Sequence, residues 1–329
     1  MSATQSLRPG VYAPILTHFQ TDGTEQICFE SFNSNIARLG KAGVGILIGG
    51  TLGEGPFLER DERIALIKSA RETLKGLKLE SIPIISGVTG SSVRECISQA
   101  KDAGSAGADA IIVVAPAYFS FVYGKNKPAI KDFFTSIADQ SPVPMMIYNI
   151  PFAAGGIDLD ADFLVDISEH QNIAGVKLTC FNIAKGYRVA LHVNSAEYRA
   201  RHPLPFLVLP GCTDYLLPAI LGRQHGCIGG PANLYPKLCV KIFETGKKAM
   251  ETGNMELLLE AQKLQDIVTE ADSVINNFGF VSIKTAMGIH VDKSLAGVFR
   301  KPLYRLEDEG SIQELRTGLA KAFEVENSL

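Results

Sequence analysis

The chain has 329 residues, of which 46% are hydrophobic and 20% are charged, as is usual for a globular protein with a large core. A formal net charge of −3 and a pI near 6.1, with no basic run, argue against a nucleic-acid-binding surface. No uninterrupted apolar stretch is long enough to span a bilayer, which argues against a membrane protein.

The N-terminal residues and the cysteines both favour a cytoplasmic protein. Residues 1–6 lack the charged-then-apolar layout of a secretory signal. The cysteines form no C-x-x-C pair and no dense framework, so we expect mostly buried, reduced thiols. Cys212 and Cys227 fall near predicted strand ends, but no histidine-containing motif accompanies either, which disfavours a catalytic or redox role. The six cysteines are Cys28, Cys96, Cys180, Cys212, Cys227 and Cys239.

Short β-branched runs alternate with longer amphipathic segments over most of the sequence. The short runs predict strands at Val11–Leu16, Val44–Ile48, Ile82–Gly87, Ala110–Ala115, Val143–Tyr148, Ile173–Leu178, Phe206–Leu209 and Gly226–Gly229. The longer segments predict helices at Ile27–Lys41, Glu59–Gly76, Ser91–Gly107, Lys127–Gln140, Leu159–Glu169, Ile183–Ala200 and Thr213–Gly222. Parallel neighbours need crossover connections, so eight strands with intervening helices favour a (β/α)₈ TIM barrel over a doubly wound sheet.

After about Pro236 the strand pattern disappears. Helices are predicted at Leu238–Met250, Met255–Ala271, Val274–Ile289 and Ser311–Glu324. No low-complexity linker precedes them, so we expect this region to pack against the barrel. The predicted division is an N-terminal segment at 1–10, a barrel at 11–236 and a C-terminal helical region at 237–329.

Lys177 closes the short apolar run that forms the sixth predicted strand. A lysine drawn to the mouth of a hydrophobic interior loses hydration, which destabilises its ammonium form relative to the free amine. Because a neutral amine can attack a ketone, Lys177 is a candidate Schiff-base residue. The alternative is a lysine whose side chain leaves the strand end for water.

Two other strand ends carry polar groups, and barrel active sites lie at the C-terminal ends of the strands. Tyr148 closes the strand before that of Lys177, where its phenol could transfer a proton. The alternative is a tyrosine that plugs the barrel end. The segment 49–55 is rich in glycine, so its backbone N–H groups could hold an anion beside the Thr51 hydroxyl. Its alternative is a plain turn, and it lacks the spacing of a dinucleotide or phosphate loop.

Four motifs occur on these strand ends in one order and spacing: Thr51-x-Gly53-Glu54, Tyr118, Tyr148-Asn149-x-Pro151 and Gly175-Val176-Lys177. Together they resemble the dihydrodipicolinate synthase / N-acetylneuraminate lyase family of pyruvate-dependent class I aldolases. The resemblance covers roughly residues 9–236, and the helical tail is similar to the family's C-terminal bundle.

The resemblance implies roles for the catalytic candidates. Lys177 would form an imine with pyruvate or another 2-keto acid, and Tyr148 would be the general acid/base near the C–C bond. Thr51 would hold the pyruvyl carboxylate. Tyr118 is similar to a family tyrosine that crosses a subunit boundary to extend the proton relay. A homo-oligomer, built as a dimer of dimers, is therefore implied.

The resemblance also implies a set of backbone contacts to the substrate. Gly50 and Leu52 would lie in the loop whose N–H groups hold the carboxylate, and Gly211 and Ile228 match positions that line the pocket. No cofactor is implied. No metal is expected, since the sequence has no H-x-x-x-H motif and no clustered Cys/His ligands.

Three positions depart from the family pattern. Leu52 stands where a second threonine is usual, and Ala117 replaces an aromatic residue associated with lysine feedback. Ala153 stands where dihydrodipicolinate synthases carry an arginine that grips the carboxylate of the second substrate. Loss of such a bidentate clamp predicts a different partner for pyruvate.

Four further polar residues receive structural or minor interpretations. Glu54 is expected to fix the turn rather than act as an acid. His18 is expected at the surface or hydrogen-bonded rather than facing substrate. Asp214 is a candidate helix cap. Thr179 is a weaker candidate for contact with a substrate hydroxyl.

The leading hypothesis is a Schiff-base lyase that cleaves a 2-keto-3-deoxy sugar acid, or a related 4-hydroxy-2-oxo acid, to pyruvate and an aldehyde, or catalyses the reverse condensation. The alternatives are dihydrodipicolinate synthesis from pyruvate and aspartate semialdehyde, and a sugar-acid dehydratase working through the same imine. From other classes, a keto-acid-binding barrel without turnover and a phosphate- or flavin-binding barrel stay open. The glycine-rich end of the eighth strand favours the last of these.

Overall fold

A single parallel sheet of eight strands forms the centre of the protein, and its strand order is β7-β6-β5-β4-β3-β2-β1-β8. The computed structural model describes residues 7–329, so the expectation for residues 1–6 lies outside the described residues. The strands are β1 (Gly10–Pro14), β2 (Gly45–Ile48), β3 (Ile84–Val88), β4 (Ala110–Val114), β5 (Met145–Asn149), β6 (Ile173–Leu178), β7 (Leu207–Pro210) and β8 (Gly226–Ile228).

The two ends of the strand order meet and close the sheet into a barrel. The backbone N–H of His225, just before β8, donates to Val208 O in β7 (2.9 Å), and Gly10 N of β1 donates to His225 O (2.8 Å). The predicted (β/α)₈ barrel with a C-terminal helical extension is confirmed, and each strand lies within two residues of its predicted bounds.

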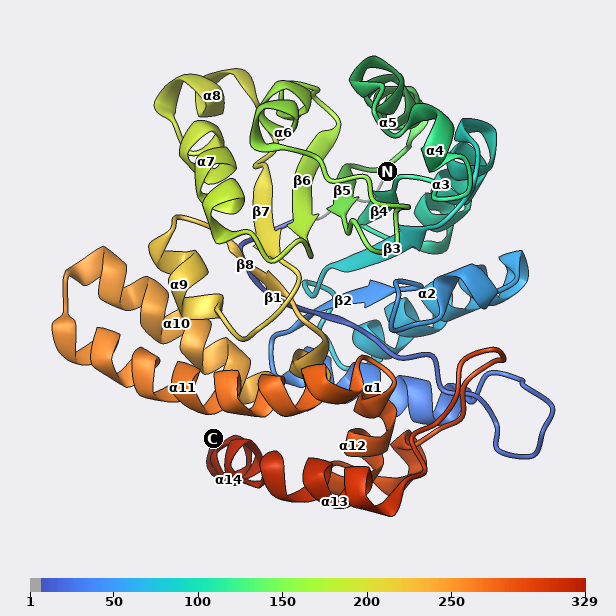
Figure 1. Ribbon diagram of the computed structural model, residues 1–329, viewed down its shortest axis with the longest axis vertical. Coiled ribbons are helices and arrows are strands. Elements are labelled where there is room, and N and C mark those ends of the chain that lie inside the picture. The colour runs from blue at the N-terminus through green and yellow to red at the C-terminus, as the bar shows by residue number, and fades with distance from the viewer. Residues whose placement is uncertain (1–6) are drawn as a thin grey trace.

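Helices follow the strands and surround the barrel (Figure 1). They are α1 (Phe29–Lys41), α2 (Arg60–Gly76), α3 (Val93–Ala106), α4 (Ser120–Tyr123), α5 (Lys127–Gln140), α6 (Ala161–Ser168), α7 (Ile183–Val193), α8 (Ala196–Arg201) and α9 (Leu216–Leu221). Where a helix was predicted over Ile183–Ala200, the structure has the two helices α7 and α8. The break occurs because Ser195 caps the second helix, its hydroxyl accepting from Tyr198 N (3.2 Å).

The C-terminal region is helical and lies along one side of the barrel (Figure 1). Its helices are α10 (Pro236–Thr252), α11 (Met255–Phe278), α12 (Ser282–His290), α13 (Glu309–Gly318) and α14 (Ala320–Ser328). The prediction of a break between residues 271 and 274 is wrong, because Asp272 lies inside α11. Its buried carboxylate accepts from the hydroxyls of Thr213 and Tyr235, and burial raises its pKa to about 7. The predicted helix Ser311–Glu324 is also wrong, since two helices meet at Leu319.

The strands are buried on both faces, as their continuous apolar character predicted. The barrel interior is filled by Tyr12, Leu47, Ile85, Ala110, Ile112, Met146, Ala174, Leu207, Leu209 and Ile228. A second, larger core lies between the strands and the surrounding helices. None of the described helices combines the length and the apolar character that crossing a membrane requires.

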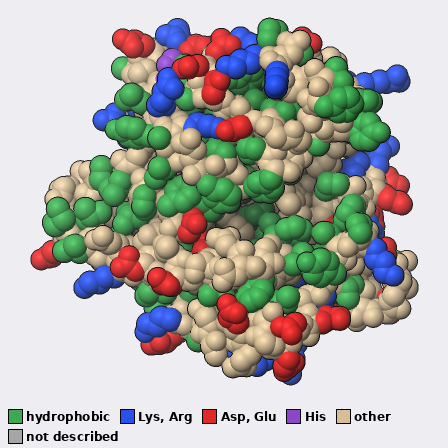
Figure 2. Space-filling model, viewed as in Figure 1, with side chains coloured by type: hydrophobic (Ala, Val, Ile, Leu, Met, Phe, Trp, Pro, Cys, Tyr) green, Lys and Arg blue, Asp and Glu red, His purple; other side chains and the backbone are tan. Residues whose placement is uncertain are grey.

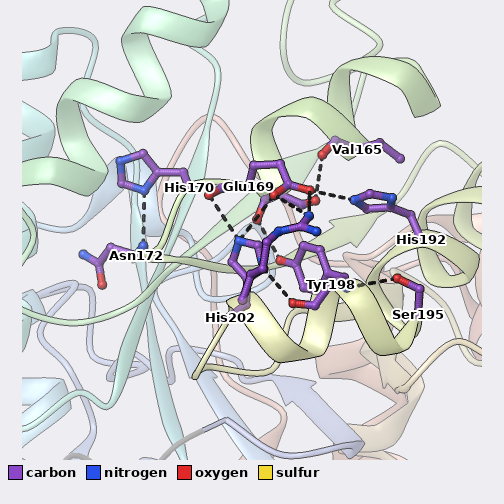
Figure 3. Close-up of polar contacts among 10 residues, drawn as sticks. Val165, Glu169, His170, Asn172, His192, Ser195, Tyr198 and His202 are labelled. Carbon is purple, nitrogen blue, oxygen red and sulfur yellow. Dashed lines mark hydrogen bonds and ion pairs between the residues drawn. The ribbon is translucent and has the colours of Figure 1, made fainter.

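A polar cluster joins α6, α7 and α8 near the N-terminal ends of β6 and β7 (Figure 3). Glu169, which follows α6, contacts His192 (2.9 Å) and pairs with Arg201 (3.0 Å). The backbone O of Glu169 contacts the ring of buried His202 (3.2 Å), and that ring stacks on Tyr198. Since these contacts lie at the end of the barrel opposite the C-terminal strand ends, we interpret the cluster as structural.

Candidate active site

Lys177 and Tyr148 lie side by side at the C-terminal ends of neighbouring strands. The parallel register of β5 and β6 pairs Tyr148 with Lys177 directly. Lys177 is only 4% exposed, and its Nζ lies 4.2 Å from the centroid of the Tyr148 ring. The lysine side chain therefore points into the barrel mouth instead of leaving the strand end for water.

The Tyr148 hydroxyl lies in a polar environment inside an apolar barrel. Thr179 Oγ1 donates to it (3.4 Å). Burial raises the pKa of the phenol, but the charge of Lys177 and hydrogen bonds from neighbouring hydroxyl and amine groups lower it more, so the net pKa lies below its ordinary value. A phenol with a lowered pKa gives up its proton more easily, which suits proton transfer.

The loop after β2 is tightly folded against the barrel. Glu54 has left-handed backbone geometry (φ +54), and a Cβ on Gly55 would lie 1.9 Å from Gly49 O. Thr17 Oγ1 donates to Gly53 O (2.6 Å). Within residues 7–329, the N–H groups of positions 50–53 donate to no protein acceptor, whereas those of Glu54 and Gly55 do. Free donors in a rigid loop can receive an anion.

A cavity of about 330 Å³ opens at these strand ends. Its lining includes four of the predicted site residues, Gly50, Thr51, Tyr148 and Lys177, together with Thr89 and Ser91 after β3. Figure 2 shows a hollow near the centre of this face, with hydrophobic side chains gathered around it. Lys177 is the one cation among the described residues that line the cavity.

The other predicted site residues lie elsewhere. Leu52, Gly211 and Ile228 are absent from the cavity lining as far as residues 7–329 are concerned, and Ile228 is fully buried in the barrel interior. A Cβ on Gly211 would lie 1.9 Å from Thr179 Oγ1, so Gly211 packs against the residue that contacts Tyr148. Tyr118 is 79% exposed on the loop before α4.

The C-terminal region supplies residues that the sequence analysis missed. Phe280, between α11 and α12, and Leu303 line the cavity. Lys284 of α12 forms an ion pair with Glu54 (2.6 Å), and both side chains are 0% exposed. Burial lowers the pKa of Lys284 to about 8, although Glu54 raises it. In the sequence, the only indication of this buried ion pair was a lysine within the apolar stretch 283–287.

Two minor predictions are corrected, and one is confirmed. His18 is neither at the surface nor hydrogen-bonded within the described chain: it is buried beside Gly297, and burial lowers its pKa to about 3. Asp214 caps no helix, because α9 begins at Leu216 without a side-chain cap. Glu54 fixes the loop, as expected. In residues 7–329 no group of three or more His, Cys, Asp or Glu side chains is arranged to hold a metal ion.

A lysine beside a tyrosine at the mouth of a (β/α)₈ barrel suits Schiff-base chemistry, and the comparisons with known proteins give the class of enzyme, the pyruvate-dependent lyases. The model of the Dihydrodipicolinate synthetase family matches residues 8–321 of the chain. The chain therefore belongs to this family.

Relatives with named activities include both aldolases and 4-hydroxy-tetrahydrodipicolinate synthases. The chain is 34% identical to the L-threo-3-deoxy-hexylosonate aldolase of Hypocrea jecorina, covering 99% of this chain and 100% of the relative. It is 36% identical to an Emericella nidulans protein named "Probable 4-hydroxy-2-oxoglutarate aldolase, mitochondrial", covering 87% and 86%. A solved structure of a dihydrodipicolinate synthase family protein from Coccidioides immitis is 31% identical, covers 99% of both chains and superposes with a TM-score of 0.81.

Proposed function

We propose that the protein cleaves a 2-keto-3-deoxy sugar acid to pyruvate and an uncharged hydroxyaldehyde. The observation that carries this proposal is the charge of the cavity, in which Lys177 is the one cation among the described lining residues. An aldehyde that carries its own carboxylate would bring a second anionic group into the cavity, and Ala153 in the lining offers no positive charge to pair with it. Thr89 and Ser91 offer hydroxyls that suit a polyhydroxylated partner.

In the proposed mechanism, the Lys177 amine attacks C2 of the substrate, and loss of water gives a protonated imine. Tyr148, whose own proton has passed to the departing water, then takes the proton of the C4 hydroxyl. The C3–C4 bond then breaks, the aldehyde leaves, and the electron pair of that bond passes into the imine to form an enamine. Protonation of the enamine at C3 and hydrolysis of the imine release pyruvate and the free amine.

The carboxylate of the substrate is assigned to the loop after β2. The N–H groups of residues 50–53, including Gly50 and Leu52, have no acceptor among residues 7–329, and together with the Thr51 hydroxyl they support this assignment. The backbone of Gly211 and of Ile228 is assigned to the wall near Lys177, as the family resemblance implies. At Leu52, Gly211 and Ile228, which are absent from the cavity lining among residues 7–329, only the backbone is assigned to the substrate.

Tyr118 is assigned to the active site of a neighbouring subunit in a homo-oligomer, a dimer of dimers. Its supporting observation is a cluster of exposed aromatic side chains after β4, Tyr118, Phe119 and Phe121, and Phe152 after β5 is exposed as well. A monomer with full activity in analytical sedimentation would contradict this assignment. Cytoplasmic location also stays a proposal, since two of the relatives carry the word mitochondrial in their names.

A second candidate substrate is 4-hydroxy-2-oxoglutarate, because a relative at 36% identity carries that name. Its cleavage yields pyruvate and an anionic aldehyde, glyoxylate, for which the described lining residues offer no cation besides Lys177. Dihydrodipicolinate synthesis faces the same difficulty with aspartate semialdehyde. A dehydratase would share the imine but would expel a hydroxide from the sugar acid instead of breaking a C–C bond.

Borohydride trapping with pyruvate tests the chemistry, and a substrate panel tests the specificity. We expect one reduced adduct of pyruvate on Lys177, located by peptide mapping, and none in Lys177→Ala. Among 3-deoxy-2-keto hexonates, 4-hydroxy-2-oxoglutarate and aspartate semialdehyde, we expect the highest kcat/KM for a hexonate. The absence of an adduct would remove the aldolase proposal, whereas faster turnover of an anionic partner would remove only the substrate assignment.

A further inference from the structure

An ion pair between residues 230 positions apart joins the C-terminal region to the loop after β2. Lys284 Nζ lies 2.6 Å from Glu54 Oε1, and neither side chain is accessible to solvent. The second carboxylate oxygen of Glu54 accepts the backbone N–H of Arg300 (2.9 Å). Both oxygens of this one carboxylate are therefore occupied by the C-terminal region.

Lys284 is itself held by several groups. Its Nζ donates to Val298 O (2.6 Å) and lies 4.0 Å from the centroid of the Phe299 ring. The following residue, Arg300, donates to Phe57 O (2.8 Å) and pairs with Glu62 (2.5 Å), at the start of α2. In Figure 1 this C-terminal segment lies beside the loop that follows β1. The ammonium group therefore has a fixed position relative to the barrel mouth.

Glu54 links the fixed Lys284 ammonium group to the loop residues 50–53 that precede it. Its backbone N–H donates to Thr51 O (3.1 Å). Its backbone is left-handed, and the glycines on either side, Gly53 and Gly55, are tightly packed, so the turn has little room to change its conformation. A shift of the Glu54 side chain would have to move the turn as a whole. The free N–H groups of residues 50–53 would move with it.

We propose that Lys284 is a positioning residue for substrate binding: through Glu54 it holds Thr51 and the N–H groups of residues 50–53 in the arrangement that receives the carboxylate of pyruvate. The inference rests on the proposed function, which assigns the carboxylate to this loop. It explains why a helix outside the barrel carries a fully buried lysine. A buried ion pair is a weak source of stability by itself, so a role in fixing one geometry is the better account.

Three variants distinguish an effect on the geometry of the loop after β2 from an effect on the stability of the protein. Lys284→Met removes the ammonium group and leaves the Glu54 carboxylate buried without its ion-pair partner. The double variant Glu54→Gln/Lys284→Met removes both charges, so it contains no unpaired buried charge and restores much of the melting temperature. Arg71→Met is the matched control. It breaks a mostly buried pair with Asp109 (2.5 Å) near the N-terminal end of β4, away from the cavity.

The measured quantities are the melting temperature and the initial rate of borohydride trapping on Lys177 as a function of pyruvate concentration. We expect the half-saturating pyruvate concentration to rise at least tenfold in both Lys284 variants, with the same adduct formed at saturation. In Arg71→Met we expect a lower melting temperature and an unchanged half-saturating concentration. The binding defect should thus persist in the double variant, where stability recovers.

A half-saturating concentration within twofold of wild type in the folded double variant overturns the positioning role, and it does so even if Lys284→Met fails to fold. An equal rise in Arg71→Met also overturns it, because the effect would then follow stability alone. If the wild-type protein itself forms no adduct, the proposed function fails and this inference fails with it. An adduct in wild type with no change in the variants overturns the positioning role only.

Discussion

Replacing Tyr148 by phenylalanine tests the proposed proton transfer at a single atom. The ring stays, so its contact with Lys177 at 4.2 Å is kept. The lost hydroxyl gives up the weak hydrogen bond from Thr179 at 3.4 Å and the polar contacts with Lys177 and Thr51, a loss of about 1 kcal/mol of stability. We therefore expect little change in the free energy of unfolding.

The expected effect on catalysis is much larger. A positioned general base contributes about 10²–10⁴ in rate, so kcat should fall by that factor, equivalent to about 3–5 kcal/mol of activation free energy. Pyruvate trapping on Lys177 should persist, because the amine and the carboxylate loop are intact. The assays are single-turnover cleavage of the sugar acid and borohydride trapping with pyruvate.

Tyr12→Phe is the matched control at the other end of the barrel. The Tyr12 hydroxyl donates to Arg8 O (2.7 Å) at the N-terminal end of β1. Its loss should lower the free energy of unfolding by about 1 kcal/mol and leave turnover unchanged. The reasoning is refuted if Tyr148→Phe keeps kcat within tenfold of wild type, or if both variants lose activity equally.

Three further variants test the loop, the C-terminal helix and a buried histidine. Gly55→Ala places a Cβ 1.9 Å from Gly49 O, so the displaced loop should abolish pyruvate trapping; normal trapping would show that the loop tolerates the shift. Glu326→Ala leaves the N–H groups that begin α10 unpaired and should cost about 2–3 kcal/mol in urea unfolding, whereas the exposed control Glu324→Ala should cost below about 0.5 kcal/mol. Burial and the nearby Arg199 charge lower the pKa of His225 to about 4, below the 6.5 of the unfolded chain. The unfolded state therefore binds more protons between pH 6.5 and 4, and stability falls as the pH falls through that window, by up to about 3 kcal/mol. His225→Gln should flatten this slope in urea titrations at pH 7 and 4.5, and an unchanged slope would contradict the assignment.

The alternation of strands and helices and the proximity of Tyr148 to Lys177 could both be predicted from the sequence. Apolar periodicity is a local property, so the eight strands could be placed to within two residues. Neighbouring strands in a parallel barrel are usually consecutive in the chain. For that reason Tyr148 and Lys177, each closing its own strand, were expected side by side, and their register confirms it. The division into segments 1–10, 11–236 and 237–329 stays a prediction.

The partners of the buried polar groups, in contrast, depend on the tertiary structure. A helix break was predicted between residues 271 and 274, yet Asp272 lies inside α11, where hydroxyls of Thr213 and Tyr235 donate to its carboxylate. Glu54 and Lys284 are 230 positions apart, and nothing local to either residue encodes their contact. Contacts between residues far apart in the sequence depend on how the C-terminal region packs on the barrel, so the local sequence pattern cannot specify them. The residues that the C-terminal region supplies to this site could therefore be found only in the structure.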